Sequence, residues 1–189
     1  MKPELGLSEE KRIVPDYLNE YLSDIGIGHV VELREYNPRY QEIFSKESER
    51  IMAAFGQLPI SLHHIGSTSV EGLCAKPIID MLLTYPEPVT LENIKKTLVG
   101  LGYFFREDLL PDRNYFVFED SNGVRYFSIT VFSDEDERSR GMLTFRDNLR
   151  NDSSIMEEYA AIKRRLSTEA MDGKEYTNKK SEFIQCHSK

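Results

Sequence analysis

The chain has 189 residues, which is enough for one good hydrophobic core and hardly for two. Its net charge of −8 argues against general affinity for a nucleic-acid backbone, because phosphate binding needs a basic face. A local basic pocket is still compatible with that balance. No run approaches the ~18 apolar residues of a transmembrane helix. Neither nucleic acid in general nor a membrane is therefore an expected partner.

Cys74 and Cys186 lie far apart in the sequence, and no spacing of cysteine and histidine suits a metal site. Free thiols are expected in a reducing compartment. The first residues lack the apolar region of a signal peptide. These features predict a cytoplasmic protein.

The first quarter of the chain predicts helices around one strand. Residues 8–25 carry apolar side chains at helical spacing, with Pro15 as an interruption or as the first turn of a second helix. The alternation in residues 29–36 predicts a strand. The turn at Asn37-Pro38 then begins a helix that continues to about residue 55 and carries an apolar stripe on one face.

The rest of the chain predicts strands followed by helices. Apolar runs at 60–65 and 77–84 indicate two strands, and 90–101 indicates a helix. A short strand follows in 103–108. Two aromatic and β-branched runs around Asn122-Gly123 then predict a hairpin, because Asn-Gly is the strongest short-range hairpin signal. Helical patterns occupy three last segments: 135–151, 153–170 and 173–186.

This order predicts an α+β fold, with a mixed sheet of five or six strands backed by helices and a C-terminal helical layer. Residues 1–28 are expected to form a helical N-terminal extension, and residues 29–187 a single domain. The tyrosines and leucines of the extension could dock another chain or a second copy. Packing on its own domain is the favoured alternative.

A polar turn follows the strand at 60–65. Gly66, Ser67, Thr68 and Ser69 combine small side chains with hydrogen-bond donors. Such a turn suits an anion site next to backbone N–H groups, and it equally suits a plain capped turn. Taken alone, the turn favours the second reading.

Asp80 lies in the next apolar strand, on the same face as Leu82. A carboxylate there needs a cation, hydrogen-bond donors or a metal ion, because an unpaired one is costly to desolvate. Lys76 and the polar turn are candidate partners, so a structural aspartate and a substrate site both stay open. His63 and His64 alternate across the first strand, and His64 is a further candidate metal ligand against ordinary local hydrogen bonding.

The segment HHIGSTSVEGLCAKPIIDMLL resembles the signature of the GrpB family, which belongs to the nucleotidyltransferase-fold superfamily. VELREYNPRYQEIFSKESERI resembles the first strand and helix of that family. LTFRDNLRNDSSIMEEYAAIKRRL and YTNKKSEFI resemble its C-terminal helices. The resemblance covers nearly all of residues 30–185, and this breadth is more specific than any single motif.

The resemblance implies a nucleotidyltransferase-like fold in which a Gly-Ser turn binds nucleotide phosphates and paired carboxylates hold Mg²⁺. Asp80 matches the first carboxylate, but Leu82 occupies the position of the second. The candidates for a third acid, Ser128 and Thr130, are not anionic. Mg²⁺ at Asp80 is therefore expected with an incomplete ligand set, since one carboxylate does not supply the oxygen ligands that Mg²⁺ prefers.

Basic residues of the C-terminal helices are predicted to complete a phosphate site with Lys76 and the turn. Arg146 and Arg150 lie four residues apart on one helix face, and a guanidinium pair suits phosphate. A solvated face paired with acidic neighbours is their alternative. Lys163 is expected to face inward, and Lys180 lies in a segment that carries the resemblance.

Two functions stay open. The first is a nucleotidyltransferase that acts on a nucleotide or a phosphorylated small molecule, with Asp80 and Ser67 as catalytic residues and Mg²⁺ as cofactor. The second is a binding protein for such a molecule, which keeps the fold and the anion pocket but not the metal pair. A homo-oligomer is compatible with either function, and the sequence does not specify the substrate.

Overall fold

The computed structural model describes residues 14–28, 32–110, 112–168 and 173–188, and it describes the backbone but not the side chains of 173–179. Its strands are β1 (Ser61–Ile65), β2 (Ile79–Tyr85), β3 (Phe104–Phe105), β4 (Asn114–Glu119) and β5 (Arg125–Ser133). Its helices are α1 (Arg39–Phe55), α2 (Leu91–Gly100), α3 (Glu137–Asn151), α4 (Ser153–Thr168) and α5 (Gly173–Cys186). Two short 3₁₀ helices, η1 (Asp16–Tyr21) and η2 (Ser67–Ser69), complete the described elements.

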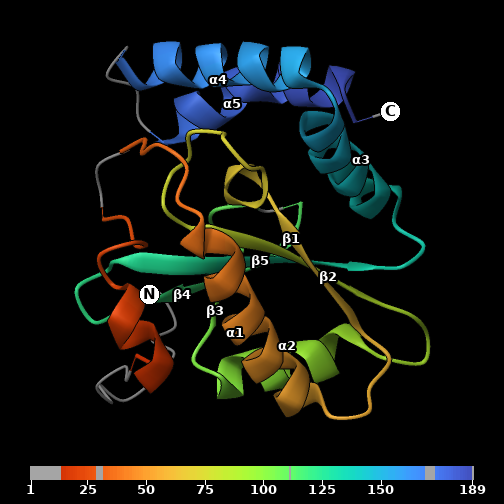
Figure 1. Ribbon diagram of the computed structural model, residues 1–189. Helices are drawn as coiled ribbons and strands as arrows, with labels where there is room; N and C mark the ends of the chain where they lie inside the picture. The colour runs from red at the N-terminus through yellow and green to blue at the C-terminus, as the bar shows by residue number, and fades with distance from the viewer. Residues whose placement is uncertain (1–13, 29–31, 111, 169–172, 189) are drawn as a thin grey trace, which may run out of the picture.

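The strands form one mixed sheet in the order β1-β2-β5-β4-β3. β2 and β5 are parallel, whereas the other neighbouring strands are antiparallel. Helices α1 and α2 cover one face of the sheet, and α3, α4 and α5 lie over the other (Figure 1). The predicted α+β fold with a mixed sheet and a C-terminal helical layer is confirmed, with five strands among the described residues.

The face of the sheet toward α1 and α2 is apolar. Side chains alternate along a strand, so Ile79, Met81 and Leu83 of β2 leave this face together. They join the largest cluster of buried residues with Ile43 and Ile51 of α1 and with the aromatic residues of β4 and β5. This core explains why the aromatic and β-branched runs of the hairpin form strands.

The opposite face is partly polar, and it carries Asp80 and Leu82. Asp80 is paired in register with Ser128 of β5, and Leu82 with Thr130. Near α3 the same face is apolar, where Leu82 and Phe132 pack with partly buried residues of that helix. The fold therefore places a polar strip in the middle of the sheet, beneath the C-terminal helices.

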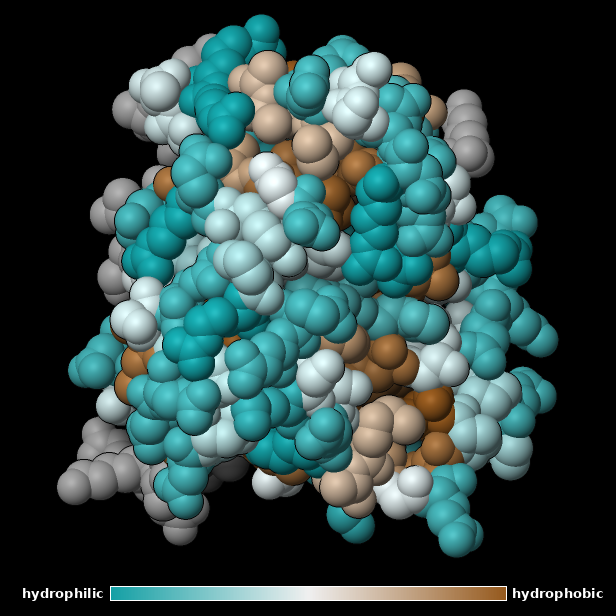
Figure 2. Space-filling model, in the orientation of Figure 1, coloured by the Kyte–Doolittle hydropathy of each residue, from teal (hydrophilic) through white to brown (hydrophobic). Residues whose placement is uncertain are grey.

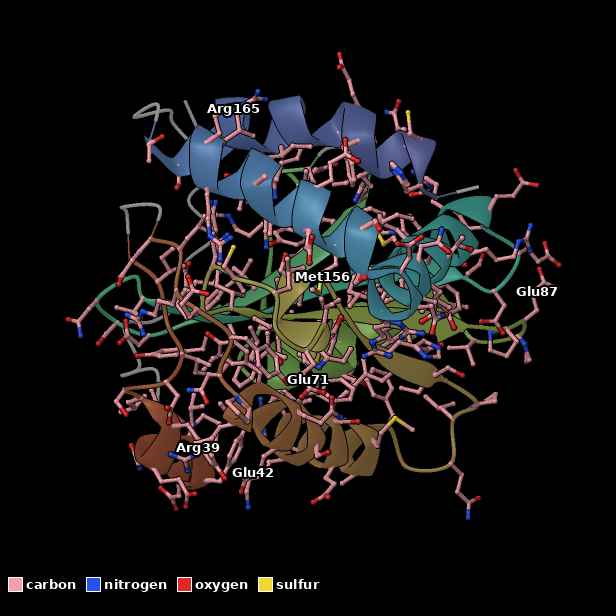
Figure 3. The ribbon with its side chains drawn as sticks, turned by 45° about the horizontal axis from the view of Figure 1, so that its top comes forward. Arg39, Glu42, Glu71, Glu87, Met156 and Arg165 are labelled. Atoms are coloured by element: carbon pink, nitrogen blue, oxygen red, sulfur yellow. The ribbon has the colours of Figure 1, made fainter. Side chains whose placement is uncertain are left out.

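The N-terminal segment from residue 14 belongs to the core of the domain. The side chains of Leu18 and Tyr21 are buried in the main core. The Tyr21 hydroxyl donates a hydrogen bond to Glu42 at 2.6 Å, and Arg39 forms an ion pair with Asp24 at 2.8 Å. Figure 3 shows Arg39 and Glu42 at the start of α1, beside this segment. The structure thus supports packing on its own domain for 14–28, while residues 1–13 lie outside the described part.

Two predictions for this region are wrong in detail. The helix predicted over 8–25 is, where described, the 3₁₀ helix η1 that follows Pro15. The strand predicted over 29–36 is absent from residues 32–36, where Arg34 forms only an isolated bridge with Ala75. Pro77, two residues after Ala75, has no N–H to continue an antiparallel ladder, so the pairing stops at one bridge. Residues 29–31 lie outside the described part.

The hairpin and the predicted cap of α2 are confirmed. Asp120 Oδ1 accepts hydrogen bonds from the backbone N–H groups of Asn122 and Val124 at 2.8 and 2.9 Å, and Gly123 has a φ of +76°. Thr90 caps α2 by accepting from Asn93 N at 3.3 Å. Local side-chain hydrogen bonds thus define the turns that the sequence predicted.

The molecular face in Figure 2 is mainly hydrophilic, with hydrophobic residues gathered in a few places. The exposed large hydrophobic residues of the described part come from separate segments: Leu22, Leu58, Val99 and Leu109. Among the described helices, none is both long enough and apolar enough to span a lipid bilayer.

Candidate functional site

The polar turn between β1 and β2 divides into an outer and an inner pair of residues. Gly66 is exposed and Ser67 is half-buried, whereas Thr68 and Ser69 are buried. The Thr68 hydroxyl donates to the carbonyl of Ile78 at 3.1 Å, and the Ser69 hydroxyl donates to that of Gly66 at 2.6 Å. Thr68 therefore holds the turn against the residue that precedes β2, Ser69 closes the turn on itself, and Gly66 and Ser67 face outward.

His64 supports the turn from the other side of the sheet. Its Nε2 lies 3.0 Å from the Thr68 hydroxyl, and its ring stacks on Phe44 with 4.7 Å between the ring centroids. Its Nδ1 lies 3.4 Å from Gln41 Oε1, so both ring nitrogens face polar partners. Burial lowers the pKa of His64 to about 3, and the charges of Arg150 and Arg146 act in the same direction. The imidazole is therefore neutral.

His64 and Asp80 leave opposite faces of the sheet. In the antiparallel register His64 is opposite Met81, whereas Asp80 is opposite Ile65. Residues directly opposite one another share a face, and neighbours along a strand do not. A single ion therefore cannot be bound by both side chains, which removes His64 as a companion ligand for Asp80.

The two oxygens of the Asp80 carboxylate have different neighbours. Ser128 donates a short hydrogen bond to Oδ1. Oδ2 lies against Gly66, so closely that a Cβ atom built on Gly66 would be 2.7 Å away from it. Burial raises the pKa of Asp80, against the Ser128 hydrogen bond and the charges of Lys180, Lys76 and Arg125, which all lower it. Asp80 is thus partly buried between a hydroxyl, a glycine and three cations.

Those cations come from three separate segments: Lys76 from the loop before β2, Arg125 from the start of β5, and Lys180 from α5. Burial lowers the pKa of Lys180 to about 8, and the charge of Lys76 lowers it further, whereas Asp80 raises it. Burial also lowers the pKa of Lys76, which Asp80 again opposes. The groups act on one another, so they form one electrostatic cluster with three basic groups and one carboxylate.

Tyr115 adds a second hydroxyl to this cluster. It is opposite Thr130 in the register of β4 and β5, two residues from Val117, which is opposite Ser128. Burial raises the pKa of Tyr115, and the charge of Asp80 raises it further. The phenol is therefore protonated.

The residues at this site do not fit Mg²⁺. Leu82, Ser128 and Thr130 occupy the positions next to Asp80 that would have to supply further carboxylates. Among the described residues there is no group of three or more His, Cys, Asp or Glu side chains that could hold a metal ion. Mg²⁺ takes oxygen ligands, typically including one or two carboxylates, and three cations around a single carboxylate oppose a divalent cation. The Mg²⁺ expectation stays a prediction that the donor set does not favour.

Arg150 contacts the backbone of the turn, and Arg146 contacts the backbone of β1. Arg150 donates from Nε and from a terminal nitrogen to the carbonyl of Ser69 at 3.0 and 2.8 Å. Arg146 donates to the carbonyl of His64 at 3.2 Å and forms an ion pair with Asp147 at 2.8 Å. Through these contacts Arg146 holds α3 against β1, and Arg150 holds α3 against the turn. Phosphate binding by them stays a prediction.

Lys163 faces inward, as its segment predicted, but it is bonded to the backbone. Only 1% of its surface is exposed, and Nζ donates a short hydrogen bond to the carbonyl of Cys74. Nζ also lies 5.1 Å from the centre of the Tyr159 ring. Burial lowers the pKa of Lys163 to about 7. Lys163 therefore fastens α4 to the loop before β2, and a phosphate role for it stays a prediction.

The C-terminal helices are packed over the turn by apolar residues. Val70, Leu73 and Cys74 form a cluster with Leu149 of α3 and Tyr159 of α4. Figure 3 shows Glu71 on this loop and Met156 on α4 above it. Lys180 thus reaches the Asp80 cluster from a helical layer that is anchored beside the turn.

Sequence reasoning missed Arg125 and Tyr115. Their distance along the chain from Asp80 hides them, and only the register of β2, β5 and β4 brings them together. The Asn-Gly hairpin could have located Tyr115, because it fixes which residues of the two strands face each other.

Comparison with known proteins identifies relatives of this chain. The family described as GrpB protein matches residues 30–189. A UPF0157 protein of Halalkalibacterium halodurans is 33% identical over 175 residues, which cover 88% of this chain and 88% of the relative. The UPF0157 protein YqkA of Bacillus subtilis is 32% identical over 157 residues, which cover 82% of this chain and 45% of the relative.

Two solved structures share the fold. The crystal structure of conserved protein GrpB from Enterococcus faecalis has a TM-score of 0.72 at 27% identity, and the match covers 83% of this chain and 94% of that one. The Cid1 poly(U) polymerase, solved with MgGTP bound, has a TM-score of 0.50 at 10% identity, covering 71% of this chain and 44% of that one. The second likeness, at 10% identity, shows a shared fold and nothing of the chemistry.

Proposed function

This chain belongs to the GrpB family, and we propose that it binds a phosphorylated small molecule at the Asp80 cluster without a metal ion. The observation that carries the proposal is the charge of the cluster: Lys76, Arg125 and Lys180 all act on a single carboxylate. With all four groups ionised their sum is +2, and Glu119, which lies 3.9 Å from Arg125, reduces it to +1. A site of that charge attracts a phosphate dianion in a protein whose net charge is −8.

The partial burial of the lysines supports the same function. Burial lowers the pKa values of Lys180 and Lys76, so their charged forms lack full solvation in the unliganded protein. A bound phosphate would add charge-assisted interactions to both ammonium groups. Ser67 and Gly66, on the outer side of the turn, leave room for the ligand because their side chains are small.

The enzyme hypothesis is weaker on chemical grounds. Two-metal nucleotidyl transfer needs carboxylates that bridge the ions. The positions beside Asp80 hold Leu82, Ser128 and Thr130 instead. The likeness to the Cid1 polymerase supports the fold of such an enzyme but not its ligand set. The residues beside Asp80 support the binding of a ligand and not the transfer of a nucleotidyl group.

The proposal is tested by calorimetric titration of the protein with AMP, in EDTA and in Mg²⁺. Binding is expected in EDTA, and Lys180→Met should weaken it by about tenfold to a hundredfold, because a charge-assisted hydrogen bond is worth ~1.5–3 kcal/mol. Lys96→Met is the matched control, since Lys96 is exposed on α2, on the other side of the sheet.

Three results would contradict the proposal. The first is the absence of binding by AMP and by other phosphate compounds. The second is binding that requires Mg²⁺ and is lost in Asp80→Ala, which would support the enzyme hypothesis instead. The third is equal loss of affinity in Lys180→Met and Lys96→Met, which would place the ligand elsewhere.

A further inference from the structure

The Asp80 carboxylate is unusual for an anion site, because a negative charge beside bound phosphate weakens binding. A purely basic cluster would attract phosphate better than one with a carboxylate at its centre. Asp80 nevertheless lies among Lys76, Arg125 and Lys180, and their charges act on it. Its presence requires an interaction that compensates for the repulsion when the ligand is bound.

We propose that the ligand carries a hydroxyl group near its phosphate, and that Asp80 Oδ2 accepts a hydrogen bond from this hydroxyl while the three cations hold the phosphate. The inference rests on the proposed function and names the class of its ligand: a hydroxylated phosphomonoester.

The two oxygens of Asp80 show where such a hydroxyl would lie. Oδ1 accepts the hydrogen bond of Ser128, which fixes the orientation of the carboxylate. Oδ2 lies 2.7 Å from the position of a Cβ atom on Gly66, and Gly66 is exposed. Asp80 is partly exposed, and within the described part of the chain Oδ2 accepts no hydrogen bond, so this oxygen remains for a donor from the ligand. Any other residue at 66 would place a carbon atom 2.7 Å from Oδ2 and would displace the carboxylate.

The chemistry of the surroundings selects a hydroxyl from the groups that could meet Oδ2. A second acceptor would be repelled by the carboxylate, and an apolar group would desolvate it without return. An ammonium group would be repelled by the three cations around Asp80. A hydroxyl is a neutral donor, and its bond to a carboxylate is strengthened by the charge of the acceptor.

The test compares two matched pairs of ligands in EDTA, by calorimetry or by titration followed with NMR. Glycerol 3-phosphate and propyl phosphate differ in hydroxyls close to the phosphate. AMP and 2′,3′-dideoxy-AMP differ in the hydroxyls of the ribose. The hydroxylated member of at least one pair should bind about tenfold more tightly, equal to ~1.4 kcal/mol. The pair that shows this preference distinguishes a small polyol phosphate from a nucleoside monophosphate.

Asp80→Asn should act in opposite directions on the two members of that pair. The preference for the hydroxylated ligand should fall to about twofold or less, because the acceptor loses its charge. The ligand without hydroxyls should bind more tightly than to the unaltered protein, because a like charge has been removed. Asp16→Asn, at an exposed position of η1, should leave both affinities unchanged.

The possible failures are distinguishable. Equal affinities within both pairs in the unaltered protein would overturn the hydroxyl inference and leave the phosphate site in place, and this comparison needs no variant. A preference that survives in Asp80→Asn would overturn the role of Asp80. No binding by any of the four ligands would overturn the proposed function itself.

Discussion

Replacing Gly66 by alanine should damage both the fold and the site. Gly66 has a φ of +69° and a ψ of −173°, a region that is essentially restricted to glycine. Forcing another residue into such a region costs about 1–3 kcal/mol. The new Cβ would also lie 2.7 Å from Asp80 Oδ2 and 3.0 Å from Asp80 Cβ, so the carboxylate must move away from Ser128. Losing that hydrogen bond adds about 1 kcal/mol.

We therefore expect Gly66→Ala to lower the free energy of unfolding by about 2–4 kcal/mol, measured by urea denaturation. Gly72→Ala is the matched control, since Gly72 has a φ of +78° but no atom within 4 Å of its added Cβ. The control should lose only the backbone contribution, about 1–2 kcal/mol, and should keep its affinity for phosphate ligands. Equal unfolding energies and equal affinities in the two variants would refute the close approach of Gly66 to Asp80.

Three further predictions concern the framework around the site. Glu47 is fully buried and accepts hydrogen bonds from Tyr17, Tyr103 and Arg50, so Glu47→Gln should lower the unfolding free energy by about 3 kcal/mol in urea denaturation. The exposed control Glu49→Gln should change it by less than about 0.5 kcal/mol. Similar losses in both variants would contradict the role of Glu47. Burial lowers the pKa of Lys163 from 10.5 to about 7, so the unfolded chain binds a proton that the folded chain lacks between those values, and stability should rise with pH there. Denaturation between pH 7 and pH 9 should show a weaker rise in Lys163→Met than in the unaltered protein, and identical slopes would show that Lys163 does not titrate in this range. Arg150→Met, which loses two hydrogen bonds to Ser69, should lower the unfolding free energy by about 1–2 kcal/mol, whereas the exposed Arg140→Met should not; an Arg150→Met protein of unchanged stability would argue against its fastening role.

The sequence predicted the sheet and helices well where local signals were strong. Asn122-Gly123 lies in the turn of the hairpin that it indicates, and Thr90 begins the helix that it indicates. Both signals are strong because their hydrogen bonds are made within a few residues. The segment around Arg34 looked like a strand by alternation alone. Its pairing depends on the loop at Ala75-Lys76-Pro77, far along the chain, and the proline there ends the ladder.

The part of the candidate site that the sequence predicted is the part whose residues are close together along the chain. Asp80, the turn and Lys76 lie close together in the sequence, so their association could be inferred from strand alternation. Arg125 and Tyr115 join them only through the strand order and register. Arg146 and Arg150, whose spacing suggested a guanidinium pair for phosphate, also donate to backbone carbonyls, because α3 packs against β1 and the turn. Spacing shows which residues share a helix face, but not what that face contacts.

The central claim is that the Asp80 cluster binds phosphate through its cations. A crystal structure of the protein grown with a bound phosphomonoester, in the presence of Mg²⁺, tests this most directly. The account predicts phosphate oxygens within hydrogen-bonding distance of Lys76 and Lys180, with no metal ion on Asp80. A Mg²⁺ ion bridging Asp80 and the phosphate, or a ligand bound away from these lysines, would contradict it.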